Sequence, residues 1–271
     1  MRYGVLGDIH GNHEALAVAL AELERRHVRQ LLCVGDVVGY NADPDECAEA
    51  LRRRGALAIA GNHDLIGTGR LDFARCSNKA MHSLKRTRRL LGSDTAAWLR
   101  ELPASRVIED AVVLVHGGVR DVEQYMVTPA HIAQNAELLR ADFPEARLCF
   151  FGHSHEQRVY AVRQDSVSEI PASGRVELDK RLVHFVNPGS IDAQRKSRHK
   201  LAEFAILDTV GWSVEFIRLP YDAAATEAKA AAFGYRLTPF LDRYYSLRRK
   251  LAARSKLAAS TAQGGRRIRS L

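Results

Sequence analysis

The chain has 271 residues, enough for one large α/β domain with a full hydrophobic core, or for a domain with an appendage. Its 46% hydrophobic and 27% charged residues are those of an ordinary soluble globular protein. No apolar run approaches the roughly 18 residues of a membrane span, and the run near the N-terminus is too short for a signal peptide. We therefore expect a cytoplasmic protein with no membrane partner.

The net charge of +8 is concentrated at the C-terminal end of the chain. Residues 248–271 carry eight basic residues and no acidic one, so residues 1–247 are neutral overall. A basic tail that contains little hydrophobic surface beyond alanine is typical of a solvated or disordered segment. Binding of this tail to nucleic acid or to an acidic partner is the less favoured alternative.

The cysteines show no C-x-x-C spacing, and two of them fall inside predicted buried strands. We interpret them as small core residues in a reducing compartment, so that a metal site in this chain would use oxygen and nitrogen ligands. They are Cys33, Cys47, Cys76 and Cys149.

Five short apolar runs predict buried strands, at residues 3–6, 30–34, 56–60, 112–115 and 148–151. A glycine-rich cluster with potential metal ligands follows each run, at the strand end where open α/β sheets bind ligands. Glycine allows unusual backbone angles and a close approach of the backbone to a ligand. The clusters are Gly7-Asp8-Ile9-His10-Gly11, Gly35-Asp36-Val37-Val38-Gly39, Gly61-Asn62-His63-Asp64, His116-Gly117-Gly118 and Gly152-His153-Ser154-His155.

Helical periodicity separates these strands. Apolar residues predict a helix over residues 12–26, and another from Pro44 to Gly55. Alternating strands and helices favour a mostly parallel central sheet. Residues 65–104 are predicted to form a longer helical segment. Its basic run at residues 85–89 is more typical of a solvated helix face than of a binding patch.

Beyond Gly152 the pattern changes to alternation. Residues 159–162, 182–186, 204–207 and 214–217 are predicted strands, which we expect to form a second sheet packed on the first. Residues 163–180 are polar and predict a protruding loop or hairpin. From Asp222 onward the sequence predicts helix, with apolar residues at three- and four-residue spacing that must bury a face against the domain or a partner.

Each ligand type alone has an ordinary explanation, because an Asp after a strand often caps a helix and Asn62 alone suggests a turn. Their joint occurrence in order, each at a strand end, favours a metal site. The predicted metal ligands are Asp8, His10, Asp36, Asn62, His116, His153 and His155.

This ordered set of motifs resembles the calcineurin-like metallophosphoesterase superfamily. Asn187-Pro188-Gly189-Ser190 resembles its small bacterial and archaeal phosphodiesterase-like branch and extends the match to about residue 219. The resemblance implies an α/β fold, a four-layer αββα sandwich of two mixed β-sheets flanked by helices. We expect residues 1–221 to form this domain and residues 222–271 to form a C-terminal helical extension with a basic, disordered tail.

The resemblance also implies two divalent ions, drawn from Mn, Fe, Zn or Ni, with Mn expected to support activity. It assigns Asp8, His10, Asp36 and His155 to one ion, and Asp36, Asn62, His116 and His153 to the other. Asp36 would bridge the two ions. A metal-bound hydroxide would attack the phosphate ester.

By the same resemblance His63 is the general acid or the stabiliser of the leaving group. Asp64 either sets the tautomer of His63 or caps a helix. We also expect Asn62, His63 and Arg195 to contact substrate, although a solvated turn is nearly as good an interpretation of Arg195. The Asp-Arg-Gly of protein serine/threonine phosphatases is missing after Asp36, which disfavours that activity.

The sequence thus favours a phosphodiesterase acting on nucleotide-like or other small phosphate esters. Alternatives are a phosphomonoesterase or phosphoprotein phosphatase, and a non-catalytic protein-interaction scaffold on the same fold. The complete ligand set disfavours the scaffold. A DNA nuclease of the recombination-repair type would need a capping domain, and this chain is too short to contain one. The physiological substrate and the oligomeric state stay open.

Overall fold

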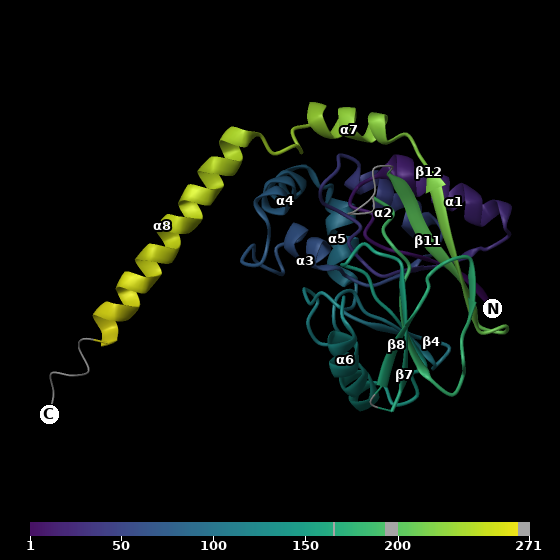
Figure 1. Ribbon diagram of the computed structural model, residues 1–271. Helices are drawn as coiled ribbons and strands as arrows, with labels where there is room; N and C mark the ends of the chain where they lie inside the picture. Colours follow the sequence, from purple (N-terminus) through teal and green to yellow (C-terminus); the bar gives the residue numbers. More distant parts are fainter. Residues whose placement is uncertain (165, 193–199, 265–271) are drawn as a thin grey trace, which may run out of the picture.

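Two mixed β-sheets stack at the centre of the computed structural model, which describes residues 1–164, 166–192 and 200–264, without the side chains of 252–264 (Figure 1). The first sheet has the order β3-β2-β1-β11-β12-β9, and the second has the order β4-β5-β6-β10-β7-β8. In the first sheet the strands are β1 (Arg2–Leu6), β2 (Gln30–Cys33), β3 (Leu57–Ala58), β9 (Arg175–Glu177), β11 (Leu201–Asp208) and β12 (Ser213–Pro220). In the second they are β4 (Arg106–Ile108), β5 (Val112–Leu114), β6 (Leu148–Phe150), β7 (Arg158–Arg163), β8 (Ser166–Ile170) and β10 (Val183–Asn187).

Helices cover the outer face of each sheet. The first sheet packs against α1 (His13–Arg25), α2 (Pro44–Arg53) and α5 (Ser93–Glu101), and the second against α6 (Pro129–Asp142). Between α2 and α5 the chain forms α3 (Asn62–Gly67) and α4 (Asn78–Leu90). The predicted four-layer αββα sandwich is therefore confirmed.

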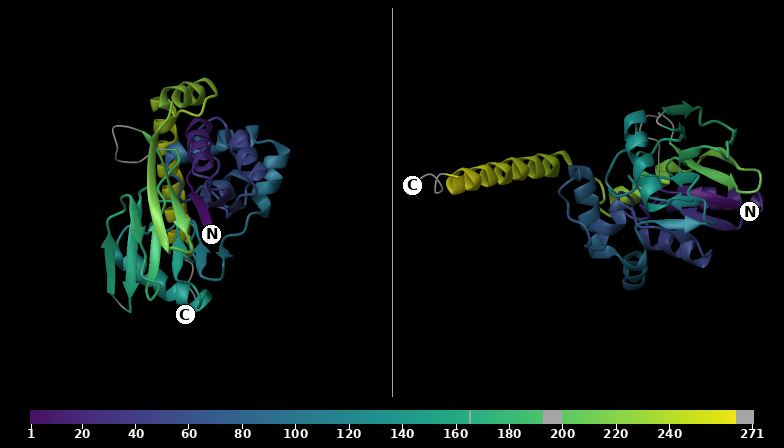
Figure 2. Two further views of the ribbon diagram at one scale, coloured as in Figure 1. Left: turned by 90° about the vertical axis from the view of Figure 1, so that its right-hand side faces the viewer. Right: turned by 90° about the horizontal axis from the view of Figure 1, so that it is seen from below.

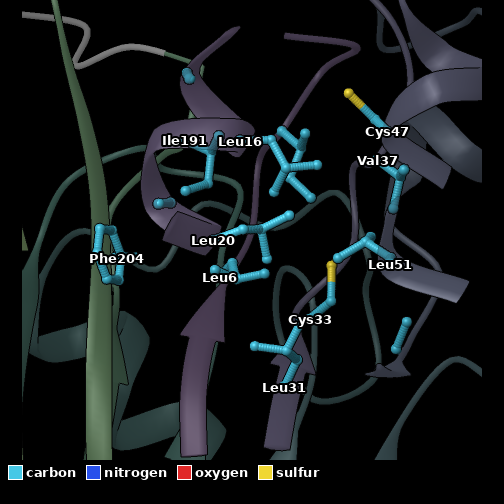
Figure 3. Packing of buried hydrophobic residues seen from close by; sticks show 14 of the residues in the cluster. Leu6, Leu16, Leu20, Leu31, Cys33, Val37, Cys47, Leu51, Ile191 and Phe204 are labelled. Atoms are coloured by element: carbon cyan, nitrogen blue, oxygen red, sulfur yellow. The ribbon is translucent and has the colours of Figure 1, made fainter. Parts of the chain in front are cut away.

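Alternation along the buried strands explains the layers. Leu31 and Cys33 of β2 face α1 and α2, where they pack near Leu20 and Leu51 (Figure 3). The intervening Leu32 points the other way, into the core between the two sheets. Because successive side chains of a strand point to opposite faces, a continuous apolar run places hydrophobic surface on both sides of the sheet.

The prediction of one mostly parallel sheet carrying all five ligand clusters is wrong. The first three clusters follow β1, β2 and β3 of the first sheet, whereas the last two follow β5 and β6 of the second. The predicted strands at 204–207 and 214–217 also join the first sheet, because β11 pairs antiparallel with β1. A period of two identifies a strand but does not identify its distant partner.

Residues 163–180 contain two strands that link the sheets. β8 forms an antiparallel hairpin with β7, while β9 pairs with β12 of the first sheet. Beyond β12 the chain forms α7 (Ala223–Ala232) and α8 (Pro239–Gly264), and α8 extends away from the sandwich (Figures 1 and 2). Among the described helices, none combines the length and the apolar composition needed to cross a membrane. The four cysteines are free and buried.

Candidate metal centre

The loops after β1, β2, β3, β5 and β6 meet at one edge of the two stacked sheets. The loops after β2, β3, β5 and β6 contribute to the lining of a cavity of about 220 Å³, and Asp36, Asn62, His63, His153 and His155 are among its lining residues. The ligand atoms of these loops form three clusters, within each of which they lie within 4.8 Å of one another. The clusters are Asp8, His10 and His155; His10, Asp36 and His63; and Asp36, His116 and His153.

Asp36 is shared by two of the three clusters. Its Oδ2 atom lies 3.3 Å from His116 Nε2 and 3.7 Å from His10 Nε2. Its Oδ1 atom accepts a hydrogen bond of 2.8 Å from the backbone N–H of His63. One carboxylate therefore faces imidazoles from both sheets while a loop amide fixes its orientation.

Asp8 has a corresponding place in the remaining cluster. Its Oδ1 atom lies 3.3 Å from His155 Nε2 and 4.0 Å from His10 Nε2. The backbone N–H of His153 donates to both oxygens of Asp8, at 3.1 and 3.0 Å. The loop after β6 thus holds the carboxylate supplied by the loop after β1.

Backbone carbonyls orient two of the imidazoles. Val38 O lies 3.2 Å from Nδ1 of His10, and Val34 O lies 2.7 Å from Nδ1 of His116. A carbonyl can only accept, so Nδ1 carries a proton in each ring, and Nε2 is the ring nitrogen that faces the cluster. This arrangement is common for metal-binding histidines.

The short distance between two ring nitrogens is also consistent with a cation bound between them. His10 Nε2 and His155 Nε2 lie 3.0 Å apart in a buried position. With the Nδ1 proton of His10 fixed by Val38, two lone pairs converge unless His155 supplies a proton. Nitrogen and oxygen donors of this kind suit a divalent transition metal, so the residues present fit a metal site.

Strained backbone coincides with the candidate ligands. Asp8, His10, Asp36, His153 and His155 have φ angles of 50°, 53°, 56°, 65° and 59°. Non-glycine residues seldom adopt this left-handed region, and such strain accumulates at functional sites. The fold holds these residues in unfavourable conformations that bring their side chains together.

Glycine is required where the loops approach these carboxylates. A Cβ atom on Gly61 would lie 2.1 Å from Asp36 Oδ1, and one on Gly152 would lie 2.9 Å from Asp8 Oδ2. These two contacts agree with the prediction that glycine lets the backbone approach the ligands.

The charges of the cluster are strongly coupled. Burial raises the pKa of Asp8, but the charge of His155 and its hydrogen bond lower it to about 2. Burial likewise opposes ionisation of Asp36, yet His116 and His63 keep its pKa well below the usual value. Burial lowers the pKa of His63 below its usual value, although the charge of Asp36 opposes this shift.

His63 and Asp64 have different environments. His63 lines the cavity, and its ring lies 4.6 Å from that of His10 and 4.7 Å from that of Tyr40. The carboxylate of Asp64 accepts hydrogen bonds of 2.9 to 3.1 Å from the N–H groups of residues 37, 38 and 61. No described hydrogen bond joins Asp64 to His63, so Asp64 fixes the loops after β2 and β3 to each other.

Two further candidate residues have distinct placements. Asn62 Oδ1 lies 3.1 Å from His116 Nε2, beside Asp36. Arg195, the predicted phosphate contact, lies outside the described residues.

Sequence analysis missed the aromatic walls of the cavity. The ring of Tyr125 lies 4.1 Å from that of His153, and the ring of Tyr40 lies 4.7 Å from that of His10. Tyr40 directly follows Gly39 of the second motif and could have been suspected from that position. Tyr125 is in a long loop after β5, where no pattern distinguished it.

A stacked αββα sandwich with histidine and carboxylate groups at its strand ends is the arrangement that the resemblance to metal-dependent phosphoesterases implies. The chain belongs to the calcineurin-like phosphoesterase superfamily, whose domain it matches over residues 1–211. It is therefore an enzyme that hydrolyses phosphate esters. The buried His and Asp clusters supply groups that could hold the metal.

Similar proteins occur in bacteria and archaea. An uncharacterized protein of Methanocaldococcus jannaschii is 28% identical over 230 residues, which cover 80% of this chain and 87% of that protein. The crystal structure of a metallophosphoesterase from Sphaerobacter thermophilus is similar with a TM-score of 0.70 and 27% identity, over 90% of this chain and 97% of that one. A hypothetical protein from Pyrococcus horikoshii shares the fold with a TM-score of 0.68 and 20% identity, over 89% and 96% of the two chains.

Proposed function

We propose that the protein is a dinuclear-metal phosphodiesterase acting on nucleotide-like or other small phosphate esters. The observation that carries this proposal is the position of Asp36, whose Oδ2 atom lies between His10 and His116 at 3.7 and 3.3 Å. A carboxylate shared by two ligand clusters suits a bridge between two ions.

The candidate ligands divide into two sets around Asp36. Two divalent ions in these sets would clamp a phosphoryl group and lower the pKa of a shared water. We propose Mn as the ion that supports activity in vitro, since mixed histidine, carboxylate and amide ligands accept several metals. The first set is Asp8, His10, Asp36 and His155, and the second is Asp36, Asn62, His116 and His153.

We assign His63 to the leaving group. Its side chain lines the cavity beside Asn62, and its backbone N–H is fixed by Asp36 at 2.8 Å. From this position the ring can donate a proton or a hydrogen bond to the departing oxygen. Asp64 supports the role indirectly by holding the loop from which His63 projects.

The cavity favours a small substrate. Its volume of about 220 Å³ is below the range of roughly 300 to 1,000 Å³ typical of drug-sized ligands. Tyr40 and Tyr125 line it and offer aromatic faces on which a flat leaving group can stack. Arg75 also lines the cavity, but its guanidinium is engaged by Asp121 at 2.8 Å. A phosphate contact by Arg195 remains part of the proposal.

The proposal is tested on the purified full-length protein, by metal analysis and by assays with added Mn²⁺. We expect two ions per chain and a higher kcat/KM for bis(p-nitrophenyl) phosphate than for p-nitrophenyl phosphate. A higher kcat/KM for the monoester would refute the diesterase assignment and favour a phosphomonoesterase. One ion per chain at full activity would refute the dinuclear centre.

A further inference from the structure

Helix α8 contacts the rest of the protein through one polar face. The partners lie on α4 and in the segment before it, which also forms a wall of the cavity through Cys76 and Ala80. The contacts join Asn78 Nδ2 to Asp242 Oδ1 at 2.8 Å and to Ser246 Oγ at 3.0 Å, the Lys85 ammonium to the Tyr245 ring at 4.8 Å, and Arg249 to the carbonyl of Cys76. The residues of α8 in these contacts therefore define its inner face.

The opposite face of α8 carries large apolar side chains in solvent. Phe240, Tyr244, Leu247 and Leu251 are 78%, 46%, 58% and 55% exposed. At 3.6 residues per turn they fall within an arc of roughly 60°, opposite the inner face. We call these four residues the apolar stripe. The sequence predicted that this helix buries its apolar face against the domain or a partner, and no described part of the chain covers the stripe.

Basic residues border the stripe on both sides. Arg248 lies on one side, and Arg243 and Lys250 lie on the other, and all three are exposed. From residue 243 to residue 271 the sequence has nine basic residues and no acidic one. The helix thus presents apolar surface framed by charge of a single sign.

This charge pattern disfavours pairing with a second copy of the chain. Phe240, Tyr244, Leu247 and Leu251 have the spacing of the core positions of a coiled coil. In a parallel pair of such helices the flanking residues of one helix meet those of the other. Arg243 would then face Arg248 of its partner, and like charges would repel.

The stripe also disfavours nucleic acid as the partner. Phosphates are bound by the basic residues alone, and an array of phosphates would leave Leu247 and Leu251 in water. An anionic bilayer satisfies both features, because its headgroups attract the arginine and lysine side chains while its acyl boundary takes up the apolar ones.

We propose that α8 is an amphipathic helix that binds the surface of an anionic membrane. The expectation of no membrane partner rested on the absence of a spanning segment, and a helix that lies in the plane of the interface needs none. Because the inner face of α8 contacts the cavity wall at Cys76, membrane binding holds the phosphoesterase domain close to the lipid surface.

The test is sedimentation of the full-length protein with vesicles, either of phosphatidylcholine mixed with phosphatidylglycerol or of phosphatidylcholine alone. We expect binding to the mixed vesicles that weakens as salt is added, and little binding to phosphatidylcholine. The double variant L247S/L251S should lower the partition coefficient by roughly 10-fold or more. Its control is V210S, which removes an apolar side chain that is 78% exposed in the turn between β11 and β12.

A second pair of variants tests the charges. Replacement of Arg243, Arg248 and Lys250 by glutamine should lower the partition coefficient by about 10- to 100-fold at low salt. The matched control replaces the exposed Arg29, Arg54 and Arg140 by glutamine, which makes the same change in net charge at sites away from α8.

Three results would overturn the proposal. The first is the absence of binding to mixed vesicles at low salt, and the second is equal binding of L247S/L251S and the unmodified protein. The third is a dimer in vesicle-free solution that L247S/L251S abolishes, which would show that the stripe joins two chains. Circular dichroism of each variant, compared with the unmodified protein, verifies that α8 is still folded.

Discussion

The candidate metal centre and helix α8 depart in opposite ways from the usual burial of apolar residues and exposure of polar ones. At the metal centre, charged and polar side chains such as Asp8, His10 and Asp36 are almost completely buried. On α8, large apolar side chains such as Phe240 and Leu247 are exposed. Buried polar groups and exposed apolar patches are the two departures from ordinary packing that carry the most information.

The two departures are stabilised differently. Buried Asp36 is held by hydrogen bonds and imidazoles from several loops, so the rest of the domain compensates for its desolvation. The stripe of α8 has no such compensation in the described structure, and only a partner can provide it. A substitution at the candidate metal centre should therefore change catalytic activity. A substitution in the stripe should change only the binding of the protein to the partner of α8.

The largest effect is expected for Asp36→Asn. The substitution removes the charge shared by both ligand sets, so both ions should be lost or weakened together. Activity should fall by more than the roughly 10⁴-fold that one acid–base group contributes. Metal analysis of the purified variant and its kcat/KM measure the two effects.

The control for this prediction is Asp110→Asn, which removes a carboxylate at an exposed position. It should leave metal content and activity unchanged. If Asp36→Asn lost only one of two ions, Asp36 would not be the bridge.

The second largest effect is expected for His63→Ala. If His63 assists the leaving oxygen, the variant should keep its metals and lose about 10²- to 10⁴-fold in kcat. The defect should be smaller for a nitrophenol leaving group than for a nucleoside, because a phenolate needs little help. The measurement compares kcat for two such diesters.

The matched control is His131→Ala on α6, outside the three ligand clusters. Equal losses on both esters would remove the leaving-group role. Loss of metal would instead place His63 among the ligands, an outcome that its cluster with His10 and Asp36 makes worth measuring.

The sequence predicted the residues around the site better than the sheets that carry them. Asp8, Asp36 and His153 follow apolar runs within motifs that are local and ordered, so their grouping could be recognised from spacing. The pairing of β11 with β1 joins residues about 200 positions apart, and no local pattern encodes it. The left-handed backbone at His10 and His155 was also outside the reach of pattern analysis.

Exposure was the least predictable property. The spacing of Phe240, Tyr244 and Leu247 correctly indicated a helix, but periodicity describes a face without saying what covers it. Tyr125 reaches the cavity from a long irregular loop, where side-chain position depends on tertiary packing. Sequence patterns therefore predict which residues gather at the strand ends more reliably than they predict what covers a helix face.

A smaller effect, on stability, is expected for Asp64→Asn. The carboxylate accepts three backbone N–H groups, and the amide replaces one accepting oxygen by a donor. A buried N–H would lose its acceptor at a cost of about 1 to 3 kcal/mol in the free energy of unfolding. Denaturant titration of the metal-free protein measures this change.

The same variant also distinguishes support of the loops from control of the His63 tautomer. A role in support predicts equal changes in kcat for good and poor leaving groups. A defect confined to poor leaving groups, with unchanged stability, would instead couple Asp64 to the chemistry of His63.

The smallest effect is expected for truncation after Arg248, judged by activity on a small chromogenic ester. The cavity is lined by residues of the phosphoesterase domain, and none of its lining residues lies beyond residue 248. The truncation removes the contact of Arg249 with Cys76, but Asp242 and Ser246 still bind Asn78. Folding, measured by thermal denaturation, and kcat/KM should therefore stay unchanged. Vesicle binding should weaken because Lys250 and Leu251 are lost.

A loss of activity on the small ester at low salt would make the tail part of the site. A loss confined to polyanionic substrates, and fading with salt, would favour nucleic acid as its partner.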